Sequence, residues 1–286
     1  MPEAAALRVP DFTLNGGNTM KMWERTLLML VVGALMPVLA AERADAASPA
    51  EIKKAGVVKV VITSSSPPHG FLDAKTNSLK GIMFEVAQAI AADMGVKAEF
   101  TEVPFGSLIP TLTSKRADMM SAPLFITPQR AEVVDFSNPV YGWGEGLVVA
   151  EGKKADYPDL KSLAGATVGC LVASVQYEML KKVEGIRDVR AYPDYIHLLA
   201  DIQAGRLDVA MVDPPSIAYQ IATHSIKGIQ RVENYKPTNA WKIGLAVNKG
   251  DKELLDVINA SLAKMKQNGQ LKRILDGWGV GHLMAN

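Results

Sequence analysis

A near-continuous run of β-branched residues at positions 57–62 (VVKVVI) is the feature that most constrains the fold of this sequence. Such a run is typical of a strand in a parallel sheet, where both faces are buried. Residues 64–70 (SSSPPHG) then predict a loop without regular structure. Apolar residues recur every four positions over 82–94, before Gly95, which predicts a helix with a glycine cap. Residues 96–100 alternate as a strand does, so the chain begins with a β-α-β series.

A short helix at residues 108–112 and a strand at 117–120 complete this first set, and the pattern then starts again. We assign to the second set the strands 147–150, 167–171 and 207–212 and the helices 174–183 and 195–204. We assign to the closing part the strand 243–247 and the helices 254–265 and 271–275. Two α/β sets of about 100 residues each predict two lobes joined by crossing strands. Ligands of such sheets bind beyond the carboxyl ends of the strands, where the lobes face each other.

The first part of the chain, residues 1–46, predicts an N-terminal extension followed by a signal peptide. Basic residues within positions 21–25 precede an uncharged apolar run at 26–40, and small residues follow that run. A membrane anchor is the alternative, but about fifteen helical residues rise only ~22 Å, less than a ~30 Å hydrocarbon core. We therefore expect export to the periplasm, a mature protein that starts between residues 41 and 48, and a linker at 46–50.

The composition argues against several classes of function. The formal net charge of +1 offers no electrostatic footprint for nucleic acid. Cys170 is the only cysteine in the sequence, so neither an intramolecular disulfide nor a cysteine-based zinc knuckle can form, and we expect a packed thiol. Paired carboxylates, a nucleophile beside a base and metal-ligand spacings are missing from the sequence. We therefore expect no catalytic residue, no metal and no cofactor.

Four stretches carry a resemblance to a known family. They are residues 103–112 (VPFGSLIPTL), 125–139 (FITPQRAEVVDFSNP), 207–214 (LDVAMVDP) and 244–251 (GLAVNKGD). In this order, and behind a signal peptide, the chain resembles the polar amino-acid class of periplasmic solute-binding proteins of ABC importers. This class is the bacterial extracellular solute-binding protein family 3, and the resemblance covers about residues 55–280.

The resemblance implies a two-lobed α/β periplasmic-binding-protein fold that closes about hinge strands. Each lobe would be a mostly parallel sheet flanked by helices. Lobe 1 would comprise residues 51–142 and 243–286, and lobe 2 residues 146–238. The implied partners are a small zwitterionic solute and the permease subunits of an ABC transporter in the inner membrane, and we expect the protein to be a monomer.

Three residues match positions at which the family holds its ligand. Arg130 corresponds to the arginine that binds the α-carboxylate, for which a guanidinium fork is suited. Ser174 corresponds to a small hydroxyl residue at a helix N-terminus, where free N–H groups attract the same carboxylate. Asp213 corresponds to the aspartate that binds the ammonium group. The alternatives are that Arg130 is a surface arginine, that Ser174 only caps its helix and that Asp213 only forms a turn.

Aromatic residues set this chain apart from the common pattern. Phe105, Phe125 and His69, with Phe71 beside them, would form an aromatic pocket that resembles the ectoine-binding members of the class. Aromatic faces there hold a delocalised cation, at about 0.5–2 kcal/mol for each desolvated contact. Core packing is the alternative for these phenylalanines.

A second departure lies at Ala122 and Pro123, where the family often has a serine or glycine pair. Ala122 would still belong to the ligand site. Because proline has no backbone N–H, the ligand geometry in lobe 1 cannot copy the common one.

Other functions remain open beside a transport receptor without chemistry of its own. A cyclohexadienyl dehydratase-like enzyme on the same fold would need an acid and a base from residues such as Glu145, Lys242 or His69. A receptor for ectoine- or betaine-type compatible solutes would use the aromatic pocket. A ligand-sensing subunit of a membrane receptor is a further reading.

Overall fold

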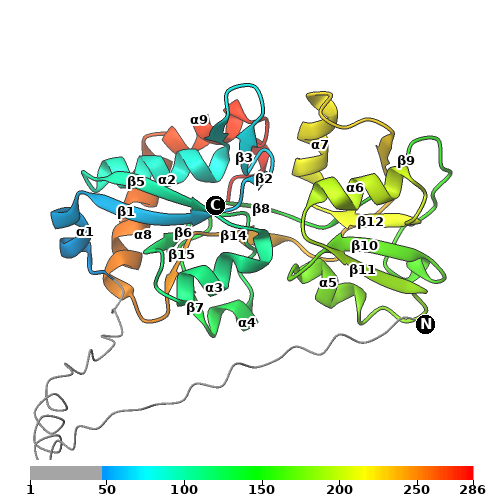
Figure 1. Ribbon diagram of the computed structural model, residues 1–286, viewed down its shortest axis with the longest axis horizontal. Helices are drawn as coiled ribbons and strands as arrows, with labels where there is room; N and C mark the ends of the chain where they lie inside the picture. The colour runs from blue at the N-terminus through cyan, green and yellow to red at the C-terminus, as the bar shows by residue number, and fades with distance from the viewer. Residues whose placement is uncertain (1–46, 286) are drawn as a thin grey trace, which may run out of the picture. The chain divides into compact units, whose positions relative to one another are not determined.

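A computed structural model describes residues 47–285 of the chain. The predicted extension and signal peptide, residues 1–46, lie outside the described residues and stay a prediction. The described part contains two five-stranded sheets, one three-stranded sheet and one two-stranded sheet (Figure 1). Helices pack against both larger sheets, so the predicted α/β fold of two lobes is confirmed.

Lobe 1 is built on the sheet with the strand order β5-β1-β6-β15-β7. Its strands are β1 (Val57–Ile62), β5 (Lys97–Glu102), β6 (Met119–Met120), β7 (Val134–Phe136) and β15 (Ala246–Asn248). β5, β1 and β6 are parallel, whereas β15 runs antiparallel to both of its neighbours. Because β15 lies near the C-terminus, the chain returns to lobe 1 after lobe 2.

The β-branched run in β1 is buried on both faces, which is what its pattern predicted. Val58 and Val60 pack in one core, and Val61 packs in a second core on the other side. All three are fully buried, and each contributes about 1.5–3 kcal/mol relative to an exposed side chain. The helices over these cores are α1 (Pro49–Ala55), α2 (Ile82–Asp93), α3 (Leu108–Thr113), α8 (Lys252–Gln267) and α9 (Gln270–Gly277).

Lobe 2 repeats the arrangement of lobe 1 in its sheet, which has the strand order β11-β10-β12-β9-β13. Its strands are β9 (Gly146–Ala150), β10 (Thr167–Leu171), β11 (Asp188–Tyr192), β12 (Val209–Val212) and β13 (Ile229–Arg231). Again, three strands are parallel and the remaining pairings, through β9, are antiparallel. The helices are α5 (Val175–Leu180), α6 (Tyr195–Gln203) and α7 (Pro214–Ala222). Cys170 is fully buried, and this burial raises the pKa of its thiol to about 12, as expected of a packed cysteine.

The chain crosses between the lobes along two short strands that pair with each other. β8 (Tyr141–Trp143) leaves lobe 1, and β14 (Trp241–Ile243) returns to it, antiparallel to β8. Gly142 of β8 lies so close to the backbone of Trp241 that a side chain would collide with it. The crossing strands predicted from the sequence are therefore present, while the exact lobe bounds of 51–142, 146–238 and 243–286 stay a prediction.

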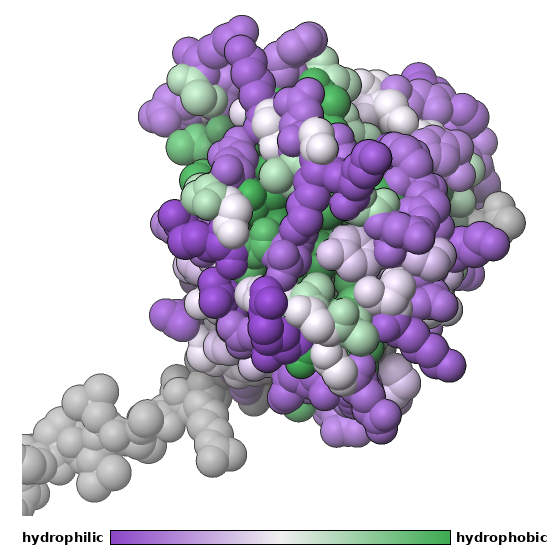
Figure 2. Space-filling view, turned by 90° about the vertical axis from the view of Figure 1, so that its right-hand side faces the viewer, coloured by the Kyte–Doolittle hydropathy of each residue, from purple (hydrophilic) through white to green (hydrophobic). Residues whose placement is uncertain are grey.

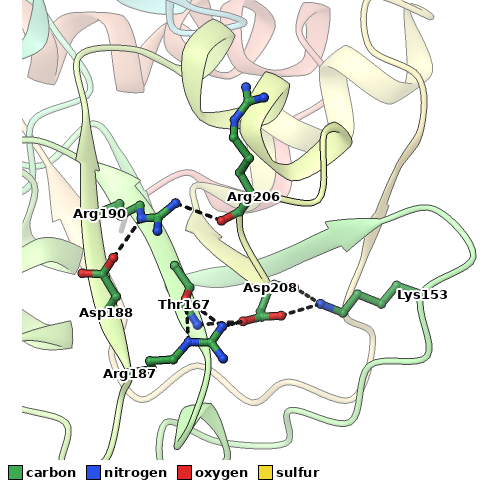
Figure 3. A network of polar contacts seen from close by, with 7 residues as sticks. All are labelled: Lys153, Thr167, Arg187, Asp188, Arg190, Arg206 and Asp208. Carbon is green, nitrogen blue, oxygen red and sulfur yellow. Dashed lines mark hydrogen bonds and ion pairs between the residues drawn. The ribbon is translucent and has the colours of Figure 1, made fainter.

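A polar network connects the amino-terminal ends of β10 and β12 in lobe 2 (Figure 3). The carboxylate of Asp208 accepts hydrogen bonds from the Thr167 backbone N–H at 2.9 Å, Lys153 Nζ at 3.1 Å and Arg187 Nη2 at 2.6 Å. The Thr167 N–H contributes most to a lowered pKa of Asp208, followed by the two cations. Because ligands bind beyond the other ends of these strands, the network stabilises the lobe and does not belong to the site.

Several elements differ from the sequence expectations. Residues 64–70 are not wholly irregular, because β2 (Ser65–Ser66), β3 (Gly70–Asp73) and β4 (Ser78–Lys80) form a small antiparallel sheet. The linker expected at 46–50 is already helical from Pro49, since the side chain of Ser48 caps α1.

The strand expected at 243–247 is two strands in different sheets, β14 and β15. Gly244 separates them, packed directly against the backbone of Ser137. The prolines after Asp213 begin the helix α7, for which proline's fixed φ is suitable, and do not form a simple turn. The remaining short elements are α4 (Pro128–Ala131), η1 (Phe105–Ser107), η2 (Lys161–Leu163) and η3 (Gly281–Leu283).

The face shown in Figure 2 is largely hydrophilic, with hydrophobic residues gathered in its middle. The exposed large hydrophobic residues of the described chain are Leu72, Val133, Val172, Ile196 and Ile221. They come from separate segments, so they do not define a binding face by themselves. Within residues 47–285, no helix has the length and apolar character needed to cross a membrane.

Candidate functional site

A small cavity lies between the lobes, beyond the carboxyl ends of their parallel strands. Its walls come from the ends of, and the segments after, β1, β5 and β6 in lobe 1 and β10, β11 and β12 in lobe 2. The lining residues are Ser66, Phe105, Pro123, Phe125, Arg130, Leu171, Ser174, Val175, Gln176, Tyr195, Met211 and Asp213. The cavity therefore lies at the edge where open α/β sheets bind ligands.

The free volume of this cavity is only about 10 Å³, roughly the space of one water molecule. An open groove of about 650 Å³ adjoins it and shares Arg130 and Ser174 with it. A solute can therefore enter the cavity only if the lobes or their side chains move.

Arg130 contacts both lobes. It lies on α4, whose N-cap Thr127 accepts a hydrogen bond from the Arg130 backbone N–H at 3.3 Å. Its Nη1 donates to the Phe125 carbonyl of lobe 1 at 2.9 Å, and its Nη2 donates to the Ala173 carbonyl of lobe 2 at 3.0 Å. Burial lowers the pKa of Arg130 to about 10, while the negative charge of Asp213 raises it. Because this pKa is still well above 7, the guanidinium is charged at neutral pH.

Asp213 supplies the opposite charge from lobe 2, at the N-cap of α7. Its Oδ1 accepts hydrogen bonds from Trp143 Nε1 at 3.0 Å and Gln176 Nε2 at 2.8 Å. Its backbone N–H donates to the Tyr195 hydroxyl at 3.0 Å. Burial raises the pKa of Asp213, while these donors and the charge of Arg130 counteract that rise.

Ser174 caps α5 and also lines the cavity, and its contact with a solute carboxylate stays a prediction. Its Oγ accepts a hydrogen bond from the Tyr177 backbone N–H at 3.1 Å and donates to the Leu171 carbonyl at 2.7 Å. The preceding residue, Ala173, has a φ of +59°, a backbone conformation that is uncommon for a residue with a side chain. This conformation belongs to the turn that presents the Ala173 carbonyl to Arg130.

Two of the predicted aromatic residues, Phe105 and Phe125, line the cavity. Phe125 is almost completely buried, with 3% of its surface exposed. Its ring stacks on Trp241 at a centroid distance of 5.0 Å and meets Trp143 edge-on at 5.3 Å. Two tryptophans from the crossing strands thus pack against a phenylalanine of the cavity lining.

The other predicted site residues lie outside the lining of this cavity. His69 is buried behind Trp143, with which it stacks at 4.5 Å, and its Nδ1 lies 2.8 Å from the Tyr141 hydroxyl. Burial lowers the pKa of His69 to about 3, so the ring is neutral and cannot supply a cation. Phe71 packs against Tyr219 and Trp278, beside a different cavity.

Ala122 is buried in the core of lobe 1, and its neighbour Pro123 lines the cavity in its place. We expected Ala122, His69 and Phe71 at the site because of the family resemblance. In the structure, Ala122 packs in the core of lobe 1, His69 against Trp143, and Phe71 against Tyr219 and Trp278.

Sequence reasoning missed four polar or aromatic residues around Asp213 and the cavity. They are Ser66, Trp143, Gln176 and Tyr195. Ser66 belongs to the polar segment after the first strand, and Tyr195 begins a predicted helix, so their positions held a weak signal. Trp143 and Gln176 had none, because their contacts with Asp213 join segments 70 and 37 residues apart.

The acid and base candidates of the enzyme reading do not line the cavity. Glu145 Oε1 accepts hydrogen bonds from the Tyr235 hydroxyl at 3.0 Å and from the Thr238 backbone N–H at 2.6 Å. Lys242 is exposed on β14, and His69 is neutral behind Trp143. Residues 47–285 contain no group of three or more potential metal ligands.

The chain is similar in sequence and fold to known proteins. The family model described as "Bacterial extracellular solute-binding proteins, family 3" matches residues 58–281. The L-cystine-binding protein TcyJ of Escherichia coli (strain K12) is 27% identical over 237 residues, covering 80% of this chain and 84% of that protein. The solved structure of an ancestral arginine-binding protein bound to arginine is 31% identical, with a TM-score of 0.73 over 78% of this chain and 98% of that one.

A further structure is that of the ancestral amino acid-binding protein AncCDT-1, a precursor of cyclohexadienyl dehydratase. It is 26% identical, with a TM-score of 0.73 over 80% of this chain and 98% of that one. The resemblance to ectoine-binding members stays a prediction. The family model covers most of the described chain and agrees with its two-lobed fold, and the chain belongs to the bacterial extracellular solute-binding proteins, family 3.

Proposed function

We propose that this protein captures a small zwitterionic solute, an amino acid or amino-acid-like compound, and delivers it to the permease of an ABC transporter. The observation that carries the proposal is the pair Arg130 and Asp213. They are the charged residues among those that line the cavity, and each comes from a different lobe. Arg130 would bind the carboxylate of the solute and Asp213 its cationic group.

The charge balance of the cavity favours a solute without net charge. Arg130 and Asp213 together are neutral, so a buried zwitterion leaves no charge unpaired. A solute such as arginine would bring one further positive charge, and a buried charge without a partner costs several kcal/mol. We therefore infer a neutral zwitterion, although arginine is the ligand in one of the similar structures.

The aromatic wall favours a compact cation. Phe105 and Phe125 line the cavity near the two charged residues and could hold an alkylated or delocalised cation through its contact with their rings. Ectoine and betaine compounds have such cations and carry a carboxylate. They are the solutes that we place beside common amino acids in the first experiment.

Closure of the lobes would follow from the position of the two charged residues, Arg130 in lobe 1 and Asp213 in lobe 2. Neither lobe alone can bind both ends of a zwitterion, so binding favours the state in which Arg130 and Asp213 face each other. Arg130 already spans the two lobes through the Phe125 and Ala173 carbonyls. A carboxylate placed beside it would strengthen the same connection.

A thermal-shift screen of amino acids, ectoines and betaines tests the proposal. A solute at a hundred times its Kd stabilises the folded protein by about 2.7 kcal/mol, which such a screen detects. Calorimetry then gives the Kd of each hit. A protein that is stabilised by cationic or anionic solutes but by no zwitterion would contradict the proposal.

A dehydratase-like enzyme is the second candidate, favoured by the similarity to the precursor of cyclohexadienyl dehydratase. Against it, the titratable side chains that line the cavity are Arg130, Asp213 and Tyr195, and burial raises the pKa of Tyr195 well above its usual value. We therefore infer a receptor without catalysis. Conversion of prephenate or arogenate by the purified protein would support the enzyme.

We infer a periplasmic location and a monomeric receptor that meets its permease in the inner membrane. Mass spectrometry of the exported protein should find an N-terminus between residues 41 and 48. An intact apolar segment at 26–40 in periplasmic material would contradict this inference.

A further inference from the structure

Trp143 lies where the hinge, lobe 1 and the ligand cavity meet. It is the last residue of the crossing strand β8, and only 5% of its surface is exposed. Its indole Nε1 donates to Oδ1 of Asp213 at 3.0 Å, and Gln176 Nε2 donates to the same oxygen at 2.8 Å. Two neutral donors thus orient the carboxylate that would bind the cation of the solute.

The indole of Trp143 is held in place by two aromatic neighbours. His69 stacks on it at 4.5 Å with an interplanar angle of 14°, and Phe125 meets it edge-on at 5.3 Å. The ring of His69 is itself held by the hydroxyl of Tyr141, 2.8 Å from its Nδ1. A ring packed in this way cannot turn its N–H away from Asp213 without displacing its neighbours.

We propose that Trp143 is a positioning residue, which fixes the Asp213 carboxylate for the cation of the solute through its indole N–H. The inference rests on the proposed function, because it requires Asp213 to bind that cation. This proposal also gives the buried, neutral His69 a role: its ring supports the indole of Trp143, on which it stacks.

The ionisation of Asp213 makes the proposal measurable. The groups that face its carboxyl are the cation Arg130, the neutral donors Trp143 and Gln176, and the tyrosines Tyr141 and Tyr195. Burial raises the pKa of Asp213, and the Trp143 donor is the largest of the contacts that lower it. Loss of the indole N–H should therefore raise this pKa further.

The expected pH effect has a definite sign. Cation binding needs the ionised carboxylate, so affinity is lost as the pH falls through the pKa of Asp213. A variant with a higher pKa loses affinity at a higher pH. The buried tyrosines have pKa values well above their usual range, and that of His69 is about 3, so these groups stay neutral between pH 5 and 8.

The test compares Trp143→Phe with the matched control Trp241→Phe. Phenylalanine keeps a ring at position 143 and removes the N–H. Trp241 pairs with Trp143 across the crossing strands and stacks on Phe125, but it is not a donor to Asp213. The measurement is the pKa of Asp213 from the NMR shift of its side-chain carboxyl carbon, assigned with Asp213→Asn. Because this titration needs no solute, it can be performed before a ligand is known.

We expect the midpoint of the Asp213 titration to rise by about one pH unit in Trp143→Phe, a tenfold change in the balance of the two protonation states. The Trp241→Phe control should keep the wild-type midpoint. An unchanged midpoint in Trp143→Phe would overturn the proposal. If Trp143→Phe does not fold, benzothienylalanine at position 143 keeps the shape of the indole and replaces its N–H by sulfur.

Binding of a probe separates the two claims. The affinities of ectoine and L-alanine are measured from pH 5 to 8, and the tighter binder serves as the probe. Loss of affinity should begin about one unit higher in Trp143→Phe than in the wild type. Equal affinity of wild type and Asp213→Asn would overturn the proposed role of Asp213 and this inference with it. Asp213-dependent binding with the same pH profile in Trp143→Phe would overturn the positioning role alone.

Discussion

Replacement of Arg130 by alanine should weaken solute binding far more than it weakens folding. The guanidinium is the cation in the lining of the cavity and would be the partner of the solute's carboxylate. Truncation of one partner in a desolvated charge pair costs about 2–5 kcal/mol. At about 1.4 kcal/mol for each tenfold change, Kd should rise about 30-fold to 4,000-fold.

The effect on folding should be smaller, because two contributions of Arg130 oppose each other. A pKa that falls from 12.5 to about 10 means that burial disfavours the charged form by about 3 kcal/mol. The hydrogen bonds to the Phe125 and Ala173 carbonyls involve a charged donor and are worth about 1.5–3 kcal/mol each. The two bonds together contribute about 3–6 kcal/mol, of which burial offsets about 3, so the free energy of unfolding should fall by no more than about 3 kcal/mol.

Calorimetry with the best solute of the screen measures the first quantity, and chemical denaturation measures the second. Arg130→Lys should remain impaired, since an ammonium group cannot form the two parallel bonds of a guanidinium fork. Arg206→Ala is a suitable control, because Arg206 is 58% exposed in a pair with Asp201. A change in Kd of less than threefold for Arg130→Ala would refute the assignment of the carboxylate partner.

Three further changes probe the two lobes. Asp213→Asn should reduce the compaction that a saturating solute produces in small-angle scattering, and undiminished compaction would show that Asp213 does not couple the lobes. Phe125→Ala should lower affinity more for alkylated or delocalised cations than for a plain ammonium, and equal losses in calorimetry would assign Phe125 to the core. Asp208→Asn should lower the unfolding free energy at pH 7 by about 1–2 kcal/mol, because the carboxylate has three donors but is one-third exposed. Since the pKa of Asp208 is lowered in the folded state, this loss should be complete above about pH 4 and fade as the pH falls further; Asp188→Asn, in an exposed pair, should change little in the same denaturation series.

The parallel strands could be predicted because burial on both faces leaves a direct mark on composition. β1 and β10 were predicted with their observed bounds, and the helix α2 within one residue. The two-residue strand β6 and the three-residue strand β13 carry no such mark, since they are too short for any period to be visible. Their place in the sheets is set by pairing with distant strands.

The residues of the candidate site also fall into those that the local sequence predicts and those that depend on distant contacts. Arg130, Ser174 and Asp213 were assigned through the family resemblance of this chain, and the structure places all three in the lining of one cavity. Trp143 and Gln176 were missed because they act on Asp213 from other segments, at a distance that local pattern does not encode. Residues that lie in a family motif are therefore accessible to sequence reasoning, and residues that contact them from a distant segment of the chain are not.

The crossing strands connect ligand binding with the motion of the lobes. β8 and β14 must change their backbone angles if the lobes move apart, and their paired tryptophans contact Phe125, which lines the cavity. Trp143 holds the Asp213 carboxylate, while Trp241 stacks on Phe125. A movement that opens the lobes therefore disturbs both the ring of Phe125 and the carboxylate of Asp213, even in the absence of a solute. Affinity in this protein should respond to substitutions in the crossing strands as strongly as to those in the cavity, because the same side chains serve both.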